Sequence, residues 1–167
     1  MENGLKGTNP HLDVFLQGEN LTLAIESKFL EILSNKKQVF SRSYFKITDH
    51  RKSSKWFRPM ERIADGKVNF TMLDAAQLIK HFFGLCYTQP DKKTVLLYLF
   101  WEPLNAEEQQ EYRQHRKELE DFSGMVERDS LLQFRHLSYN KLWSRWQTIP
   151  EMGTHSQNLV GRYESNV

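Results

Sequence analysis

An unbroken apolar run, Thr94–Trp101 (TVLLYLFW), constrains the fold more than any other part of this sequence. The run is too short for a buried helix and is rich in residues that favour strands. It has clear ends, because the charged segment Asp91–Lys93 precedes it and Pro103 follows it. Strands that are apolar at every position occur inside sheets that are covered on both faces. The run therefore predicts the central strand of a sheet.

The remaining segments alternate between strand-like and helix-like patterns. Two short runs at 12–16 and 21–29, separated by the turn-like residues 17–20, predict a β-hairpin. Period-two alternation predicts another strand over 131–137. Helical spacing predicts four helices, which we place at 55–65, at 73–83, from 105 to about 121 and at 139–146. This order predicts an α/β fold with a mixed β-sheet core flanked by α-helices.

Length and composition limit the class of protein. A chain of 167 residues corresponds to one domain, which we place at 1–149, followed by a loosely ordered tail at 150–167 that lacks a periodic pattern. The single cysteine, Cys86, excludes an internal disulfide framework and a cysteine-based zinc site. No apolar run approaches the ~18 residues that span a bilayer. The start also lacks the apolar core of a secretory signal, so the sequence predicts a cytoplasmic protein.

The predicted hairpin brings three charged side chains to one face. Side chains alternate along a strand, so Glu26 and Lys28 point the same way. Pairing of Leu16 with Leu21 would set Asp13 diagonal to Glu26 on that face. The opposite face then collects apolar residues, and we expect it to be buried: Leu12, Val14, Leu16, Leu21, Leu23 and Ile25.

Two carboxylates on neighbouring strands suit a hard divalent cation. Asp13 and Glu26 could bind one Mg²⁺, with Mn²⁺ as a substitute, and Lys28 could stabilise negative charge or orient a water molecule. Such a site suits phosphodiester hydrolysis. The alternative interpretation is an exposed hairpin face with an ordinary Glu26–Lys28 ion pair, and the spacing alone leaves both open.

These residues resemble the signature of the PD-(D/E)XK nuclease superfamily. The matching segments are Asn9–Val14 (NPHLDV), in which the proline is displaced from the aspartate, and Ala24–Phe29 (AIESKF). Later blocks at 73–81, 96–103 and 137–143 are similar to a bacterial group of restriction-endonuclease-like proteins. The resemblance implies a Mg²⁺-dependent DNA endonuclease in which Asp13 and Glu26 bind the metal, Lys28 serves the attacking water, and Gln77 is a further active-site residue.

One departure from the superfamily pattern leaves the activity open. Such nucleases usually have a helix before the first motif strand, often with another acidic residue near the metal, whereas Glu2 is the only acid before Asp13 here. We expect that N-terminal helix to be missing or shortened. The alternative function is therefore a catalytically degenerate nuclease fold that binds nucleic acid or protein. His81, on the same predicted helix as Gln77, is interpreted as a core-edge histidine with a satisfied ring nitrogen.

A basic stretch indicates an anionic partner. Residues 28–67 contain eleven Lys or Arg and four acids, although the whole chain has a formal charge of only +2. Nucleic acid, in particular DNA, fits this charge, and we expect no membrane partner. Double-strand cleavage by a small nuclease often uses two sites, which suggests a homodimer. The candidate DNA contacts are Lys36, Lys37, Arg42, Lys46, Arg51, Lys52, Lys55, Arg58 and Lys80, interleaved with the aromatic residues Tyr44, Phe45, Trp56 and Phe57.

Overall fold

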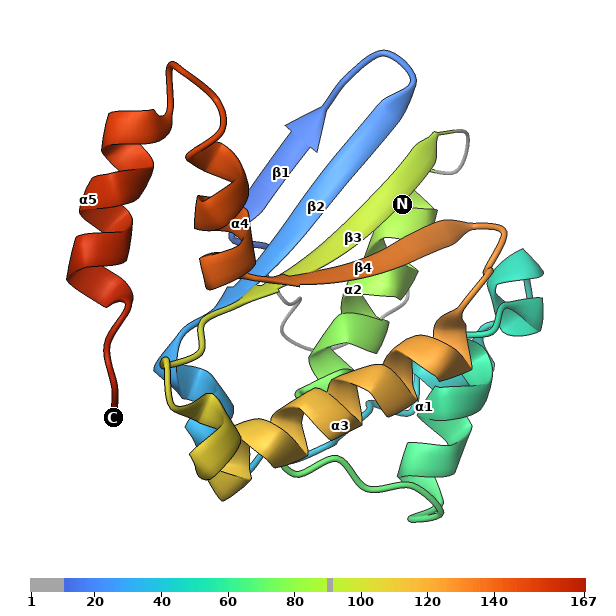
Figure 1. Cartoon of the computed structure of the whole chain (residues 1–167). Coiled ribbons are helices and arrows are strands. Elements are labelled where there is room, and N and C mark those ends of the chain that lie inside the picture. The colour runs from blue at the N-terminus through green and yellow to red at the C-terminus, as the bar shows by residue number, and fades with distance from the viewer. Residues whose placement is uncertain (1–10, 90–91) are drawn as a thin grey trace.

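A single four-stranded sheet forms the centre of the protein. The structure, a computed structural model, describes residues 11–89 and 92–167 (Figure 1). The sheet has the order β1-β2-β3-β4, in which β1 is antiparallel to β2, and β2, β3 and β4 are parallel. The strands are β1 (Val14–Gln17), β2 (Leu21–Lys28), β3 (Lys93–Phe100) and β4 (Leu132–Ser138). The predicted mixed sheet, with the apolar run as an inner strand, is confirmed.

Five α-helices in the described residues flank the sheet, together with four short 3₁₀ turns. The helix α2 begins where the Asp74 side chain accepts a hydrogen bond from the Gln77 amide, at 2.8 Å. It continues past Gly84, which the sequence suggested as its end. The helices are α1 (Phe57–Ala64), α2 (Ala75–Thr88), α3 (Gln110–Val126), α4 (Tyr139–Trp146) and α5 (Gly153–Tyr163), and the turns are η1 (Leu30–Leu33), η2 (Tyr44–Lys46), η3 (His50–Ser53) and η4 (Ala106–Glu108).

The helices α1, α2 and α3 pack together on one face of the sheet (Figure 1). The connections from β2 to β3 and from β3 to β4 both advance in the same direction across the sheet. Parallel connections are right-handed in nearly all proteins, so two that advance the same way place their helices on the same face. Ala24, Leu96 and Phe134 of the sheet meet Phe82 of α2 and Phe122 of α3 in this main core.

A buried carboxylate ties α3 to the segment that leads into α2. Glu118 of α3 accepts hydrogen bonds from the backbone amides of Thr71, Met72 and Leu73, at 2.8 to 2.9 Å. Burial raises the pKa of Glu118, but hydrogen bonds from Gln114, Thr71 and Leu73 lower it by more, so its pKa lies below the ordinary value. The carboxylate therefore remains ionised and bonded at neutral pH.

The helices α4 and α5 form a smaller second core at the carboxyl ends of the strands. Trp143 of α4 and Tyr163 of α5 pack together there, and the indole of Trp101 donates a hydrogen bond to the Tyr163 carbonyl at 3.0 Å. Residues 150–167 were expected to form a loose tail, but they contain α5, whose Leu159 and Val160 pack against this core. Apolar contacts with this core stabilise the helix, although the sequence of the segment has no clear helical spacing of apolar residues.

The side chains of the hairpin are divided between its two faces as predicted, but the strands pair in a different register. Leu16 pairs with Leu23, not with Leu21, which is a shift of two residues. A shift of two leaves every side chain on its predicted face. The expected buried face is nevertheless the open one: Val14, Leu16 and Leu21 are 41%, 54% and 45% exposed, whereas Glu26, on the other face, is 2% exposed. The positions of α2 and α3, rather than the alternation in β1 and β2, decide which face is covered.

No helix among the described residues is both long and apolar enough to cross a bilayer.

Candidate nuclease site

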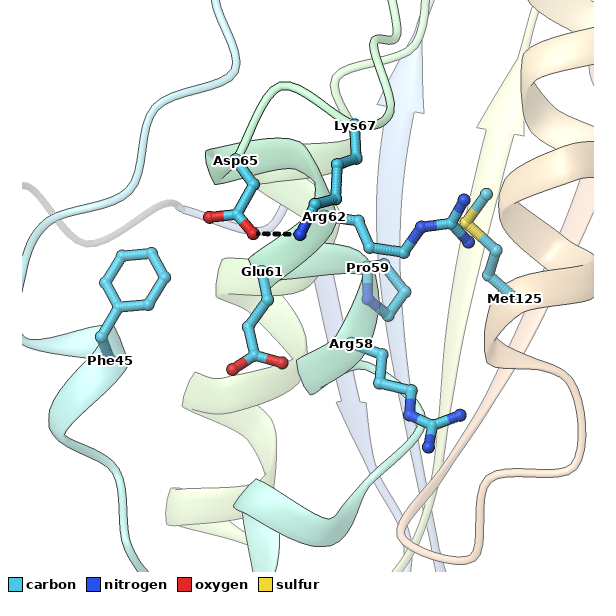
Figure 2. A pocket seen from close by; sticks show the side chains of 8 residues that line it. All are labelled: Phe45, Arg58, Pro59, Glu61, Arg62, Asp65, Lys67 and Met125. Atoms are coloured by element: carbon cyan, nitrogen blue, oxygen red, sulfur yellow. Dashed lines mark hydrogen bonds and ion pairs between the residues drawn. The ribbon is translucent and has the colours of Figure 1, made fainter.

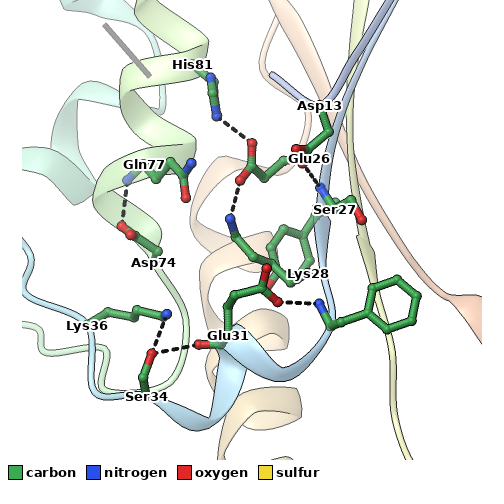
Figure 3. Close-up of polar contacts among 12 residues, drawn as sticks. Asp13, Glu26, Ser27, Lys28, Glu31, Ser34, Lys36, Asp74, Gln77 and His81 are labelled. Carbon is green, nitrogen blue, oxygen red and sulfur yellow. Dashed lines mark hydrogen bonds and ion pairs between the residues drawn. The ribbon is translucent and has the colours of Figure 1, made fainter. Parts of the chain in front are cut away.

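Glu26, near the end of β2, is the centre of a buried polar cluster (Figure 3). Its Oε2 atom lies 2.8 Å from Nε2 of His81 on α2, and its Oε1 atom accepts a hydrogen bond from the Lys28 ammonium. Lys28 shares the Glu26 face because it is two residues further along the strand. His81 faces the same strand from above because α2 covers this side of the sheet. Both carboxylate oxygens of Glu26 are therefore engaged.

The cluster keeps Glu26 ionised. Burial raises the pKa of its carboxyl, since a charged group is poorly solvated in the interior. The hydrogen bonds from His81 and Lys28, with the positive charge of Lys28, lower the pKa by more, so that it lies below its ordinary value. Buried charges in proteins are paired with other charges or coordinate metals. Glu26 thus carries a negative charge at neutral pH next to one cationic partner.

Asp13 lies next to Glu26 but its carboxylate points elsewhere. The observed register, continued by one residue from the Val14–Ile25 pair, sets Asp13 directly opposite Glu26 instead of diagonal to it. The Asp13 side chain is exposed, and its Oδ2 atom accepts a hydrogen bond from the Ser27 amide at 2.7 Å. Figure 3 shows the two carboxylates turned to different partners. The structure brings the two residues together without bringing their oxygens together.

The other residues predicted near this site lie on α2 and on the segment before it. Gln77, one turn before His81, is half-buried and extends toward Glu26 and Lys28 in Figure 3. The Lys36 ammonium donates a hydrogen bond to Ser34 Oγ at 2.7 Å, and burial lowers the pKa of Lys36. Lys80 is also on α2, with its ammonium 5.9 Å from the centre of the Phe40 ring.

The donor set fits magnesium better than it fits a transition metal. Among the described residues there is no group of three or more His, Cys, Asp or Glu side chains that could hold an ion. Protein sites for Mg²⁺, however, often contribute only one or two carboxylates and leave the remaining positions to water and substrate phosphates. Asp13 and Glu26 supply two carboxylates on adjacent strands. They match that requirement in chemistry, provided that Asp13 turns toward Glu26.

The remaining predicted DNA contacts are spread over the surface before and on α1. Arg51 is engaged by Asp49, with Nε to Oδ1 at 2.8 Å, and the Lys55 ammonium donates to the Glu127 carbonyl at 2.6 Å. Five others have exposed side chains: Lys37, Arg42, Lys46, Lys52 and Arg58. These positions keep most of the basic stretch accessible to an anionic partner.

The aromatic part of the expected nucleic-acid surface is mostly in the core. Tyr44, Trp56 and Phe57 are buried, and the Trp56 ring stacks on Phe82 at 4.9 Å between centroids. Base stacking by these three residues is therefore contradicted, because apolar packing has taken their faces. Phe45 is the exception, at 41% exposed.

A surface pocket of about 680 Å³ lies between α1 and the neighbouring segments (Figure 2). Arg58 and Phe45 line it, but so do Glu61 and Asp65, and Asp65 forms an ion pair with Lys67 at 2.8 Å. The mixed charges reduce the attraction of this pocket for phosphate. None of the Glu26 cluster lines the pocket.

His81 belongs to the cluster, although sequence reasoning treated it only as a core-edge residue. Its satisfied nitrogen was expected, but its partner is the Glu26 carboxylate. Residues four apart lie on the same side of a helix, so a helix that presents Gln77 to a site also presents His81. That spacing is the sequence pattern that could have identified it.

Comparison with models of protein families identifies a relationship over almost the whole chain. A family described as "Restriction Endonuclease associating with ARP" matches residues 2–164. This chain belongs to that family. The predicted relationship to restriction-endonuclease-like proteins is thereby confirmed, and the mixed sheet with flanking helices is consistent with their α/β fold. Comparisons with curated proteins and with solved structures give no match.

Proposed function

We propose that this protein is a cytoplasmic, Mg²⁺-dependent endonuclease that hydrolyses phosphodiester bonds in DNA. Its restriction-endonuclease family supports a nuclease-like role. Metal-dependent cleavage of DNA is supported mainly by the ionised Glu26, which is buried beside Lys28 and lies across from Asp13. A carboxylate pair next to an amine suits divalent-ion hydrolysis of a phosphodiester, because the carboxylates can hold the ion and the amine can stabilise developing negative charge.

Each residue of the cluster has a distinct role in this proposal. Asp13 and Glu26 would hold Mg²⁺, which polarises a phosphoryl oxygen and lowers the pKa of a bound water. Asp13 reaches the ion by rotating away from the Ser27 amide, and its exposed side chain can do so without rearranging the core. His81 keeps one Glu26 oxygen in place, while Lys28 turns from the other to stabilise the negative charge that develops on the phosphate.

The charge near the cluster supports DNA as the substrate. Lys36 lies beside the cluster (Figure 3), and Lys80 is one turn after Gln77 on α2. The exposed cations of the basic stretch continue from there toward α1. Lys and Arg side chains that follow a phosphate backbone provide most of the sequence-independent affinity for DNA. A homodimer would supply two sites for the two strands.

A second candidate function is DNA or protein binding without cleavage. The observation that favours it is the engagement of the carboxylates: both Glu26 oxygens have protein partners, and Asp13 is bonded to the backbone. A site that remained in this state would bring a cation against the Lys28 ammonium and leave the Asp13 carboxylate turned away from Glu26. The two functions therefore differ in whether Mg²⁺ can displace Lys28 and Asp13 from their present partners.

A plasmid-nicking assay distinguishes the two. Supercoiled DNA is incubated with the full chain and Mg²⁺ or Mn²⁺, and with Glu26→Gln and Asp13→Asn. We expect metal-dependent nicking that falls at least about 100-fold in both variants, while Glu19→Gln, which removes an acid from the hairpin turn, keeps it. Circular dichroism verifies that each variant is folded. Absence of nicking with either ion, together with intact DNA binding, would contradict cleavage and favour the binding function.

A further inference from the structure

One face of the sheet exposes apolar side chains that no other element of residues 11–89 and 92–167 covers. We define the open face by Val14 and Leu16 of β1, Leu21, Leu23 and Ile25 of β2, and Val95 and Leu97 of β3, which the register places side by side. Of these seven residues, Val14, Leu16 and Leu21 are exposed, and the other four are half-buried. The helices α1, α2 and α3 lie on the opposite face, while the α4–α5 core lies at the carboxyl ends of the strands.

This exposure is unusual for the kind of sheet involved. Parallel strands such as β2 and β3 are normally covered on both faces, and monomeric proteins seldom leave a contiguous apolar patch in water. Exposed apolar residues scattered singly would need no explanation. Here they occupy successive same-face positions on three adjacent strands, which is the pattern of a surface that is buried in an assembly.

The charges on the same face indicate the kind of partner. The register sets Lys93 beside Leu21 and Arg135 beside Leu97, so both cations point outward along one border of the apolar residues. Both are exposed, and neither forms an ion pair within the described part of the chain. The strand positions on this face include no acidic residue. A complementary partner therefore carries acidic side chains along one border of an apolar stripe.

The dimensions fit a helix. Neighbouring strands are about 4.8 Å apart, so the apolar positions from β1 to β3 span roughly 10 Å, which matches the diameter of one α-helix with its side chains. We propose that the open face binds an amphipathic α-helix of another protein, with its apolar stripe on β1 to β3 and its acidic residues toward Lys93 and Arg135. A second copy of this chain fits poorly, because two such faces would bring cations together. The proposal does not depend on nuclease activity.

Two synthetic helical peptides of about 18 residues test this directly. Both carry the same leucine stripe, bordered by Glu in one peptide and by Lys in the other, and their binding to the full chain is followed by fluorescence anisotropy. We expect the Glu peptide to bind at least tenfold more tightly than the Lys peptide. Leu16→Asp should weaken that binding at least tenfold, whereas Leu104→Asp, an equally exposed leucine outside the open face, should not. The double variant Lys93→Glu, Arg135→Glu should reverse the preference between the peptides.

Three results would overturn the proposal. Equal affinity for the two peptides, or affinity that Leu16→Asp leaves unchanged, would remove the evidence for a helix on this face. A dimer in light scattering that Leu16→Asp dissociates would assign the face to a second copy. Binding to phosphatidylglycerol vesicles that Leu16→Asp abolishes would assign it to a membrane. Glu26→Gln should bind the Glu peptide as well as the native chain does, so loss of nuclease activity and failure of this proposal are measured separately.

Discussion

At β2 the two faces of the sheet differ in a way that reverses the usual relation between polarity and burial. The face under α2 and α3 contains Thr22 and Glu26 and is closed to water, whereas the face with Leu16 and Leu21 is open. The closed face tolerates its charge because Lys28 and His81 bond to Glu26. The comparison teaches that helix connections, and not strand composition alone, determine which face becomes the core.

The largest expected effect contrasts a leucine from each face. Leu96 of β3 is fully buried under the helices, whereas Leu21 of β2 is exposed. Leu96→Ala should lower the free energy of unfolding by about 3 kcal/mol, because it leaves a cavity. Leu21→Ala should change it by less than about 0.5 kcal/mol. Urea titration followed by circular dichroism measures both, and equal losses would show that the open face is buried in the isolated protein.

A pH effect should also arise on the closed face alone. His115 of α3 is buried beside Tyr98, whose hydroxyl lies 3.0 Å from Nε2, and burial lowers the pKa of His115 to about 4 from 6.5. His115 therefore becomes protonated near pH 6.5 in the unfolded chain but only near pH 4 in the folded chain. The stabilising contribution is present above pH 6.5 and is lost as the pH falls toward 4.

Unfolding of the native chain at pH 7 and pH 5 measures this contribution. The native chain should lose about 2 kcal/mol more than His115→Gln over that interval. His11, which is exposed, provides the matched control, and His11→Gln should behave as the native chain does. Identical pH dependence of the native chain and His115→Gln would contradict a neutral, buried His115.

The smallest effect concerns the cations on either side of the sheet. Lys36→Ala together with Lys80→Ala should weaken DNA binding by about 1 kcal/mol per lysine and reduce the slope of log affinity against log salt by about 0.9 for each lost phosphate contact. Lys93→Ala together with Arg135→Ala removes the same charge from the open face and should leave both quantities nearly unchanged. Similar losses in the two pairs, measured by anisotropy with labelled duplex, would show that DNA contacts both faces.

Much of the fold follows from local patterns in the sequence. The apolar run that became β3 and the turn between β1 and β2 each determine their own conformation. The pairing of Glu26 with Lys28 was predictable because residues two apart on one strand point to the same face, whatever the register of the neighbouring strands. Period and parity are properties of the strand itself, and these predictions needed nothing else.

What could not be predicted depends on contacts between distant segments. Alternation along β1 and β2 separates two faces but does not say which one receives α2. The orientation of Asp13 depends on the hydrogen bond that the Ser27 amide donates to it, and the order of α5 depends on Trp101 and Trp143. The contact between His81 and Glu26 exists only because α2 packs over β2. Each of these outcomes is set by tertiary packing.

The Glu118 carboxylate, which binds the three amides before α2, has a consequence for the reach of substitutions. Because the segment that leads into α2 is anchored to the middle of α3, the placement of His81 above Glu26 depends on a residue that hydrogen-bonds to neither. Loss of the Glu118 carboxylate should therefore displace His81 from Glu26, although Glu118 lies on a different helix.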